Sequence, residues 1–261
     1  MKFFDSHAHY WDTRFASETE AGADVLLNSL FRDSVSGIIN VGTNLETTML
    51  SIAQAQKHPH MYVAGGIHPG DIPEDATVDA LETVWSPLFK NSENKLVALG
   101  EIGLDYHYTQ FDKMRQMAFF EAQMALAEKL SLPVIIHDRE AHGDCFDMVR
   151  NFPKVTGVFH SYSGSAEMAK ALVSRGYSIS FSGTVSFKNA RNVKETAASL
   201  PKEAVLIETD APYLTPHPHR GRLNHSGYLF YTAEAIAELW QTDVSLVAEV
   251  TEQNAKRLFK I

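Results

Sequence analysis

The sequence is poor in cysteine, in positive charge and in long apolar runs, and each shortage excludes a class of protein. Cys145 is the only cysteine among 261 residues, so the chain cannot form an internal disulfide. No apolar run reaches the roughly 18 residues that a membrane-spanning helix needs, so we expect no membrane partner. The start MKFFDSHAHYWD lacks the charged and then apolar pattern of a signal peptide. We therefore expect a cytoplasmic protein.

Acidic residues outnumber basic ones by 32 to 23, which gives a formal net charge of −9. Such a surface does not attract a polyanion over a broad area. A nucleic-acid substrate would have to be held locally, by metal ions and a few basic side chains. The 44% hydrophobic and 21% charged content is that of an ordinary globular protein with a sizeable core, which argues against disorder.

Short apolar runs of strand length recur along the chain, most of them followed by a helix-like stretch. The runs are KFFDSHA near residue 2, GIINVGT near 37, MYVAGGI near 61, LVALGEIGL near 96, LPVIIHD near 132, TGVFHSY near 156, YSISFSG near 177 and AVLIETD near 204. This alternation predicts βα units around a parallel sheet. Because no GxGxxG fingerprint follows the first run, eight units favour a closed (β/α)₈ TIM barrel over an open doubly wound sheet. We expect residues 1–261 to form one such domain.

Two helices and one long loop are predicted with particular boundaries. Apolar periodicity places a helix from Asp112 to Leu130. A second helix runs from Ala166 to Arg175, with Ser165 as its N-cap and Gly176 at its end. Residues 212–228 contain three prolines and two glycines, and we interpret them as a loop after the last strand.

Histidines and acids stand at the ends of the expected strands. They are His7 and His9 in the first unit, Glu101 in the fourth, His137 in the fifth, His160 in the sixth and Asp210 in the eighth. In a (β/α)₈ barrel the carboxyl ends of all strands meet at one face. These side chains are therefore expected to gather in a single site despite their distance along the chain.

The gathered side chains have the chemistry of metal ligands. His7 and His9 are two residues apart on a strand, so both point to the same side. Imidazole and carboxylate ligands suit Zn, Mn, Fe or Mg, and the absence of cysteine ligands argues against a structural zinc site. Glu101 can bridge two ions, so we expect two divalent ions, Mg²⁺, Mn²⁺ or Zn²⁺. Asp210 is expected to be a terminal ligand or a catalytic base, and its alternative role is a buried acid that caps the loop.

Four residues near the expected mouth are candidates for substrate binding: His68, Arg139, Arg220 and Asn224. The planar guanidinium of arginine suits a pair of phosphate oxygens. Three of these candidates also have a structural alternative. His68 is a surface residue before a proline, Arg139 forms a salt bridge to Glu140 or Asp144, and Asn224 orders its own loop.

Six motifs carry a family resemblance. They are DSHAH at 5–9, GIHP at 66–69, GEIGLDY at 100–106, PVIIHDREA at 133–141, FHSYSG at 159–164 and ETDAPYLTP at 208–216. Spread over nearly the full length and in this order, they resemble the TatD family of metal-dependent deoxyribonucleases, within the amidohydrolase-like barrels.

The resemblance implies an exonuclease-type enzyme that acts on DNA ends or single strands. We also expect a monomer without an obligate protein partner. Six residues match the family's metal-binding positions: His7, His9, Glu101, His137, His160 and Asp210. Arg220 and Asn224 match its pattern RGxxN. The chain departs from the family at His225 and Ser226, where an acid followed by proline is expected.

Two other functions remain open at this point. Related barrels with the same HxH opening hydrolyse carbonyl compounds such as lactones, amides or cyclic imines. Those relatives often use a modified lysine as the bridging ligand at the end of the fourth strand, where this chain has Glu101. A barrel that binds metal without catalysis is a third alternative, and the intact set of ligands argues against it.

Overall fold

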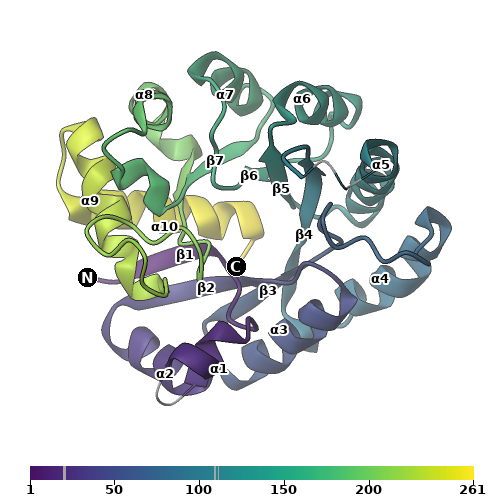
Figure 1. Ribbon diagram of the computed structural model, residues 1–261, viewed down its shortest axis with the longest axis horizontal. Coiled ribbons are helices and arrows are strands. Elements are labelled where there is room, and N and C mark those ends of the chain that lie inside the picture. Colours follow the sequence, from purple (N-terminus) through teal and green to yellow (C-terminus); the bar gives the residue numbers. More distant parts are fainter. Residues whose placement is uncertain (20–21, 109, 111) are drawn as a thin grey trace.

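The computed structural model is a ring of strands enclosed by helices (Figure 1), and it describes residues 1–19, 22–108, 110 and 112–261. Within these residues eight parallel strands pair with their neighbours in chain order, β1 to β8. Their bounds are β1 Phe3–Ala8, β2 Val35–Val41, β3 Met61–Gly65, β4 Leu96–Asp105, β5 Val134–Arg139, β6 Gly157–Phe159, β7 Ser178–Phe181 and β8 Val205–Ile207. The predicted (β/α)₈ barrel is confirmed, and all eight expected runs form strands.

Helices follow the strands on the outside of the ring (Figure 1). Their bounds are α1 Arg14–Glu18, α2 Gly22–Asp33, α3 Leu45–Lys57, α4 Leu81–Lys90, α5 Lys113–Leu130, α6 His142–Asn151, α7 Ala166–Val173, α8 Arg191–Ser199, α9 Leu229–Trp240 and α10 Val244–Phe259. Of the helices in the described part of the chain, none is both long and apolar enough to cross a membrane.

The two helices predicted from the sequence, α5 and α7, are present, and their bounds agree closely with the prediction except at the end of α7. Asp112 is the N-cap of α5, and its carboxylate accepts hydrogen bonds from the backbone of Met114 and Arg115. Ser165 caps α7 as expected, through a bond from the backbone of Met168. However, α7 ends at Val173, two residues before the predicted end, because the chain has already begun the turn that leads to Gly176.

The barrel closes between its first and last strands, just beyond the end of β8. Ala8 forms an isolated parallel bridge with Ala211, and the backbone N–H of Asp210 donates to His7 O at 2.9 Å. Asp5 reinforces this closure from inside. Its buried carboxylate accepts hydrogen bonds from the hydroxyls of Thr209 and Ser226, both at 2.6 Å, and from the backbone N–H of Thr209. Burial raises the pKa of Asp5 to about 6 although these hydrogen bonds oppose the shift.

Helix α5 fixes the end of β4 and the segment that follows β3 with buried glutamines. Gln116 accepts from the backbone N–H of Asp105 and donates to its carbonyl oxygen, at 2.8 and 2.9 Å. Gln123 makes the same pair of hydrogen bonds with Ile67, at 2.7 and 3.1 Å. Because a buried amide must satisfy its donor and acceptor, each glutamine holds its segment in one position. Both segments lead into the face where the candidate site lies.

Candidate metal centre

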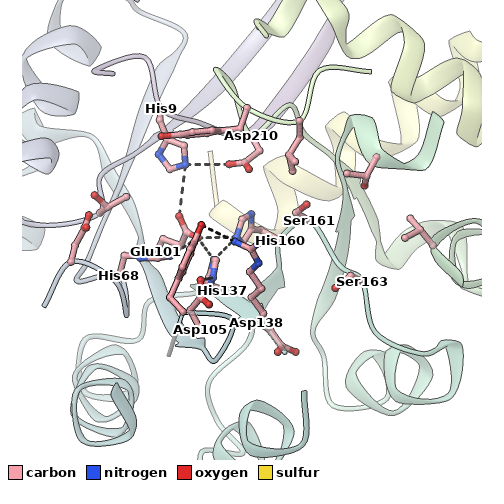
Figure 2. Close-up of a pocket in the computed structure, with 18 of the residues that line it drawn as sticks. His9, His68, Glu101, Asp105, His137, Asp138, His160, Ser161, Ser163 and Asp210 are labelled. Carbon is pink, nitrogen blue, oxygen red and sulfur yellow. Dashed lines mark hydrogen bonds and ion pairs between the residues drawn. The ribbon is translucent and has the colours of Figure 1, made fainter. Parts of the chain in front are cut away.

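A cavity of about 610 Å³ opens at the face formed by the carboxyl ends of the strands. Figure 2 shows Glu101 near its centre, with His9 and Asp210 on one side and His137 and His160 on the other. These five side chains line the cavity. His7 is fully buried just behind them. The structure therefore brings together all six side chains that the sequence placed at strand ends.

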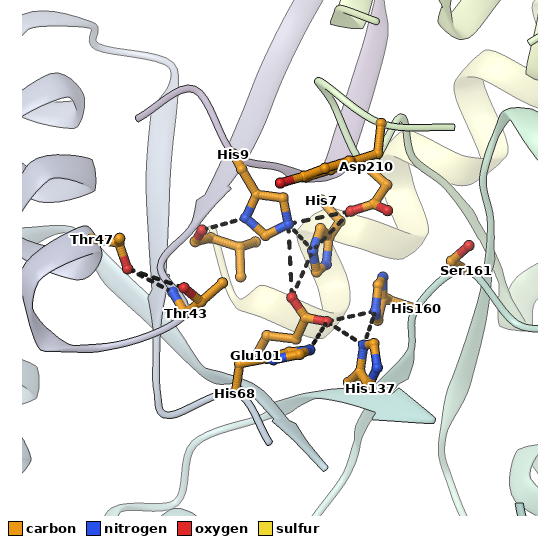
Figure 3. Close-up of polar contacts among 12 residues, drawn as sticks. His7, His9, Thr43, Thr47, His68, Glu101, His137, His160, Ser161 and Asp210 are labelled. Atoms are coloured by element: carbon orange, nitrogen blue, oxygen red, sulfur yellow. Dashed lines mark hydrogen bonds and ion pairs between the residues drawn. The ribbon is translucent and has the colours of Figure 1, made fainter. Parts of the chain in front are cut away.

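Glu101 stands between two pairs of histidines and offers one oxygen to each pair (Figure 3). Its Oε1 lies 2.7 Å from His137 Nδ1 and 2.8 Å from His160 Nε2. Its Oε2 lies 3.4 Å from His7 Nε2 and 3.7 Å from His9 Nε2. Ligand groups that share Glu101, one with His7 and His9 and one with His137 and His160, are compact enough to hold an ion each. The carboxylate is thus placed to bridge two ions.

Asp210 completes the half of the site that contains the first strand. Its Oδ1 lies 3.2 Å from His9 Nε2 and 3.7 Å from His7 Nε2. The residue has a φ of 54°, in the left-handed region that aspartate tolerates better than most residues. This conformation follows directly on β8 and turns the carboxylate toward β1. At 15% exposure the Asp210 side chain is also more accessible than that of Glu101, at 4%.

Three of the histidines are held by an acceptor on the nitrogen that faces away from the cluster. His9 Nδ1 lies 2.7 Å from the carbonyl oxygen of Val41, which only accepts hydrogen bonds. Nδ1 therefore carries the proton, and in the neutral ring Nε2 is left with a free lone pair. His137 Nε2 lies 3.2 Å from Asp105, and His160 Nδ1 lies 3.3 Å from Glu208. Such outer partners fix the tautomer that a metal ligand requires.

The charges of the cluster call for cations at its centre. Burial alone would lower the pKa of His160, but the carboxylates of Glu101 and Glu208 hold it well above its usual value. Burial would raise the pKa of Glu101, yet the facing His160 and the hydrogen bond from His137 hold it well below its usual range. The buried carboxylates need positive charge beside them, and without an ion a proton on His160 supplies it. Divalent cations can take the place of that proton, so the residues present fit divalent metal ions.

His68 reaches the same cavity but offers a different group. Its Nδ1 accepts a hydrogen bond from the backbone N–H of Gly70 at 3.0 Å. Burial, together with the positive charge of His137, lowers the pKa of His68 to about 3, so the ring is neutral. Its single proton is therefore on Nε2, which lies 3.6 Å from Glu101 Oε1. Although His68 lies close enough to Asp105 and His137 for a shared ion, it presents an N–H donor and not a lone pair.

The remaining candidates for substrate binding separate into two groups. Arg139 lines the cavity, and its guanidinium lies over the ring of Tyr108 at 5.2 Å. The acids that were alternatives for Arg139 have other partners: Glu140 pairs with His107, and Asp144 accepts from the hydroxyl of Tyr106.

Arg220 and Asn224 are missing from the cavity lining in the described part of the chain. Arg220 lies over the ring of Phe187 at 4.3 Å. Asn224 is fully buried, and its amide donates to the carbonyl oxygens of Thr209 and Tyr213 at 2.9 and 2.6 Å. The structure thus favours the alternative role of Asn224, which is to order the loop.

The sequence reasoning missed the residues that hold the ligands in place. Asp105 and Glu208 contact His137 and His160, and Asp5 holds β1 against the segment after β8. All three belong to the motifs quoted above, GEIGLDY, ETDAPYLTP and DSHAH. The sequence did contain a signal for them, because each of these acids lies within a few residues of an expected metal ligand. Ser226, which departs from the family pattern, also takes part in this support, because its hydroxyl donates to Asp5.

Comparisons with known proteins match almost the whole chain. The sequence profile described as TatD related DNase matches residues 4–260. A Bacillus subtilis protein named uncharacterized metal-dependent hydrolase YabD is 36% identical over 260 residues, which cover 99% of each chain. The Escherichia coli K12 protein named uncharacterized metal-dependent hydrolase YcfH is 35% identical over 264 residues, covering 100% of this chain and 97% of its own.

Solved structures share the same architecture. The crystal structure of YJJV, a TatD homolog from Escherichia coli K12, superposes with a TM-score of 0.88 at 29% identity and covers 99% of this chain and 98% of its own. A TatD family hydrolase from Entamoeba histolytica reaches a TM-score of 0.84 at 20% identity, with coverage of 99% and 98%, which supports the fold alone.

Proposed function

The chain belongs to the family of TatD-related DNases, and on this premise we propose that it hydrolyses phosphodiester bonds at the ends of DNA strands with two divalent metal ions. Its membership makes it a metal-dependent hydrolase. The bond that it hydrolyses and the number of ions are the proposal. The observation that carries it is Glu101, whose two oxygens face separate pairs of histidines. Two metals that share one carboxylate are suited to a displacement at phosphorus.

Six residues would hold the ions: His7, His9, Glu101, His137, His160 and Asp210. When bound, divalent ions supply Lewis acidity toward phosphoryl oxygens and activate water as a nucleophile. The role of Asp210 is to accept the proton of the attacking water on its carboxylate. Two features support this role: Asp210 is the more exposed of the two carboxylates, and it lines the cavity.

His68 and Arg139 are suited to bind the non-bridging oxygens of the phosphate. His68 offers Nε2–H as a neutral donor beside Glu101, and Arg139 offers a planar guanidinium at the cavity wall. A carbonyl substrate has fewer oxygens to neutralise and makes less use of both donors. The carbonyl-hydrolysing alternative also often relies on a lysine where this chain has Glu101. The phosphodiester is therefore the better supported substrate.

Asp105 is expected to matter for metal affinity although it does not itself face Glu101. Asp105→Asn removes the charged acceptor on His137 Nε2, so the ring is free to present the wrong tautomer. We expect metal affinity to fall by about 10 to 100-fold, the usual effect of losing such a partner. Titration against a chelating dye measures it.

Asp138→Asn is the matched control for Asp105→Asn. Asp138 is a buried carboxylate that also pairs with a histidine, His142 at 2.8 Å, which is no part of the cluster. We expect this variant to keep the wild-type metal affinity. Equal losses in both variants would contradict the role given to Asp105.

The proposed reaction is tested by offering the protein both kinds of substrate. We expect the protein with Mn²⁺ to release nucleotides from end-labelled single-stranded DNA and to leave lactones intact. Arg139→Ala is expected to lower kcat/KM on DNA by roughly tenfold to a hundredfold, because it removes a preorganised cation from the phosphate.

Arg220→Ala is the control for Arg139→Ala, since Arg220 lies over Phe187 outside the described lining of the cavity. We expect Arg220→Ala to lower kcat/KM on DNA less than Arg139→Ala does. Rapid hydrolysis of lactones without any cleavage of DNA would overturn the phosphodiester assignment, whatever the metal content.

A further inference from the structure

Two aromatic side chains, Trp11 and Tyr213, form one wall of the cavity beside His9. Trp11 follows β1 and Tyr213 follows β8, so the closure of the barrel brings them to the same side. Each ring meets His9 edge to face, with centroids 5.7 Å and 6.2 Å away and interplanar angles of 75° and 76°. Both residues line the cavity. We call this pair the aromatic wall.

The wall is held rigidly by polar contacts behind it. Trp11 Nε1 donates to the carbonyl oxygen of Val41 at 2.7 Å, and the hydroxyl of Tyr213 donates to Asp12 at 3.1 Å. Arg14 binds both carboxylate oxygens of Asp12 and lies over the Tyr213 ring at 4.1 Å. Because these partners already fix both rings, little rotamer freedom is lost when a ligand packs against them.

Tyr213 keeps much of its ring accessible in spite of these contacts. Its side chain is 45% exposed, although Arg14 covers one face of the ring. Tyr213 is also one of the residues that line the cavity. Large aromatic rings that are both fixed and exposed beside a charged cluster are suited to bind a planar apolar ligand while the cluster binds its charged part.

We propose that the aromatic wall stacks the base of the nucleotide whose phosphate lies at the Glu101 cluster. This inference rests on the proposed function, because that function puts a phosphate within reach of His9 and Asp210. The net charge of −9 disfavours binding of DNA through broad contact with its backbone. Stacking on aromatic side chains supplies affinity without added positive charge and accepts every base.

The opposite side of the cavity provides a matched control. Tyr108 follows β4, which lies across the ring from β1 and β8 in the strand order. It resembles Tyr213 in three respects: it lines the same cavity, it is 44% exposed, and an arginine, Arg139, lies over its ring. The two tyrosines stand on different sides of the cluster.

The test compares two ligands that differ only in the base, 2′-deoxyadenosine 5′-monophosphate and 2-deoxyribose 5-phosphate. Their binding to the Mn²⁺-loaded protein is measured by isothermal titration calorimetry. We expect the wild-type protein to bind the nucleotide about tenfold more tightly or better, in line with the contribution of one stacked base. Tyr213→Ala should remove this preference, and Tyr213→Phe should keep most of it because the ring remains.

Tyr108→Ala separates stacking on the aromatic wall from a general effect of losing a tyrosine. We expect it to leave the ratio of the two affinities as in the wild type, whatever it does to each affinity alone. Two results would overturn the stacking proposal and leave the phosphodiester proposal intact. One is equal binding of the two ligands by the wild-type protein. The other is loss of the preference in Tyr108→Ala but not in Tyr213→Ala. Failure of the wild type to bind either ligand would contradict the phosphodiester proposal itself, and with it the stacking proposal that rests on it.

Discussion

Glu101→Gln is expected to abolish hydrolysis. Glutamine has nearly the same volume, but it has no charge and only one oxygen, so it cannot serve both pairs of histidines at once. The loss in kcat/KM should exceed about 100-fold, which is the upper range for a residue that only orients a ligand. Bound metal, measured by elemental analysis of the dialysed protein, should fall as well.

Glu208→Gln is the graded control for this substitution. Glu208 is fully buried like its counterpart, but it contacts His160 on Nδ1, the nitrogen that faces away from Glu101. We expect a smaller loss, of about 10 to 100-fold. If Glu101→Gln retained activity within the range of Glu208→Gln, the shared carboxylate would have no special role.

Removal of metal by a chelator is expected to have the second large effect. Dialysis against excess EDTA should eliminate hydrolysis, and Mn²⁺ or Mg²⁺ should restore it. The melting temperature should fall by roughly 5 to 10 °C at the same time. An ion at 100 times its Kd stabilises the native state by about 2.7 kcal/mol, and each kcal/mol shifts a protein of this size by about 2 to 4 °C.

The Glu101→Gln variant shows whether this thermal shift comes from the described site. Its melting temperature should respond little to the chelator, because its metal ligands are already incomplete. Full turnover of the wild-type protein in excess EDTA, with an unchanged melting temperature, would contradict metal dependence.

The convergence of the six expected ligands could be anticipated because it follows from topology. Once eight strands alternate with helices, every strand end must reach the same face, so Glu101 and Asp210 become neighbours whatever lies between them. The same reasoning places His137 and His160 side by side, since β5 and β6 are paired. None of this depends on exact side-chain geometry, which explains why a single sequence was sufficient.

The finer assignments depended on side-chain directions that the sequence does not contain. Asn224 and Arg220 belong to one short segment, but the amide is buried against Thr209 and Tyr213 while the guanidinium lies over Phe187. Likewise, nothing in the spacing of Asp105 indicates that it contacts His137 on the nitrogen opposite Glu101. Such contacts are set by register and packing between distant elements, which periodicity does not report.

The contact between Asp5 and Thr209 also bears on the order of events during synthesis. The two residues are 204 positions apart, so this contact forms only after nearly the whole barrel has left the ribosome. His7 and Asp210 flank the same closure, and they belong to opposite ends of the chain. A nascent chain that ends anywhere before β8 therefore lacks Asp210 and the contacts that close the barrel beside His7. Such fragments would carry no competent centre, so hydrolysis would begin only when the last βα unit closes the ring.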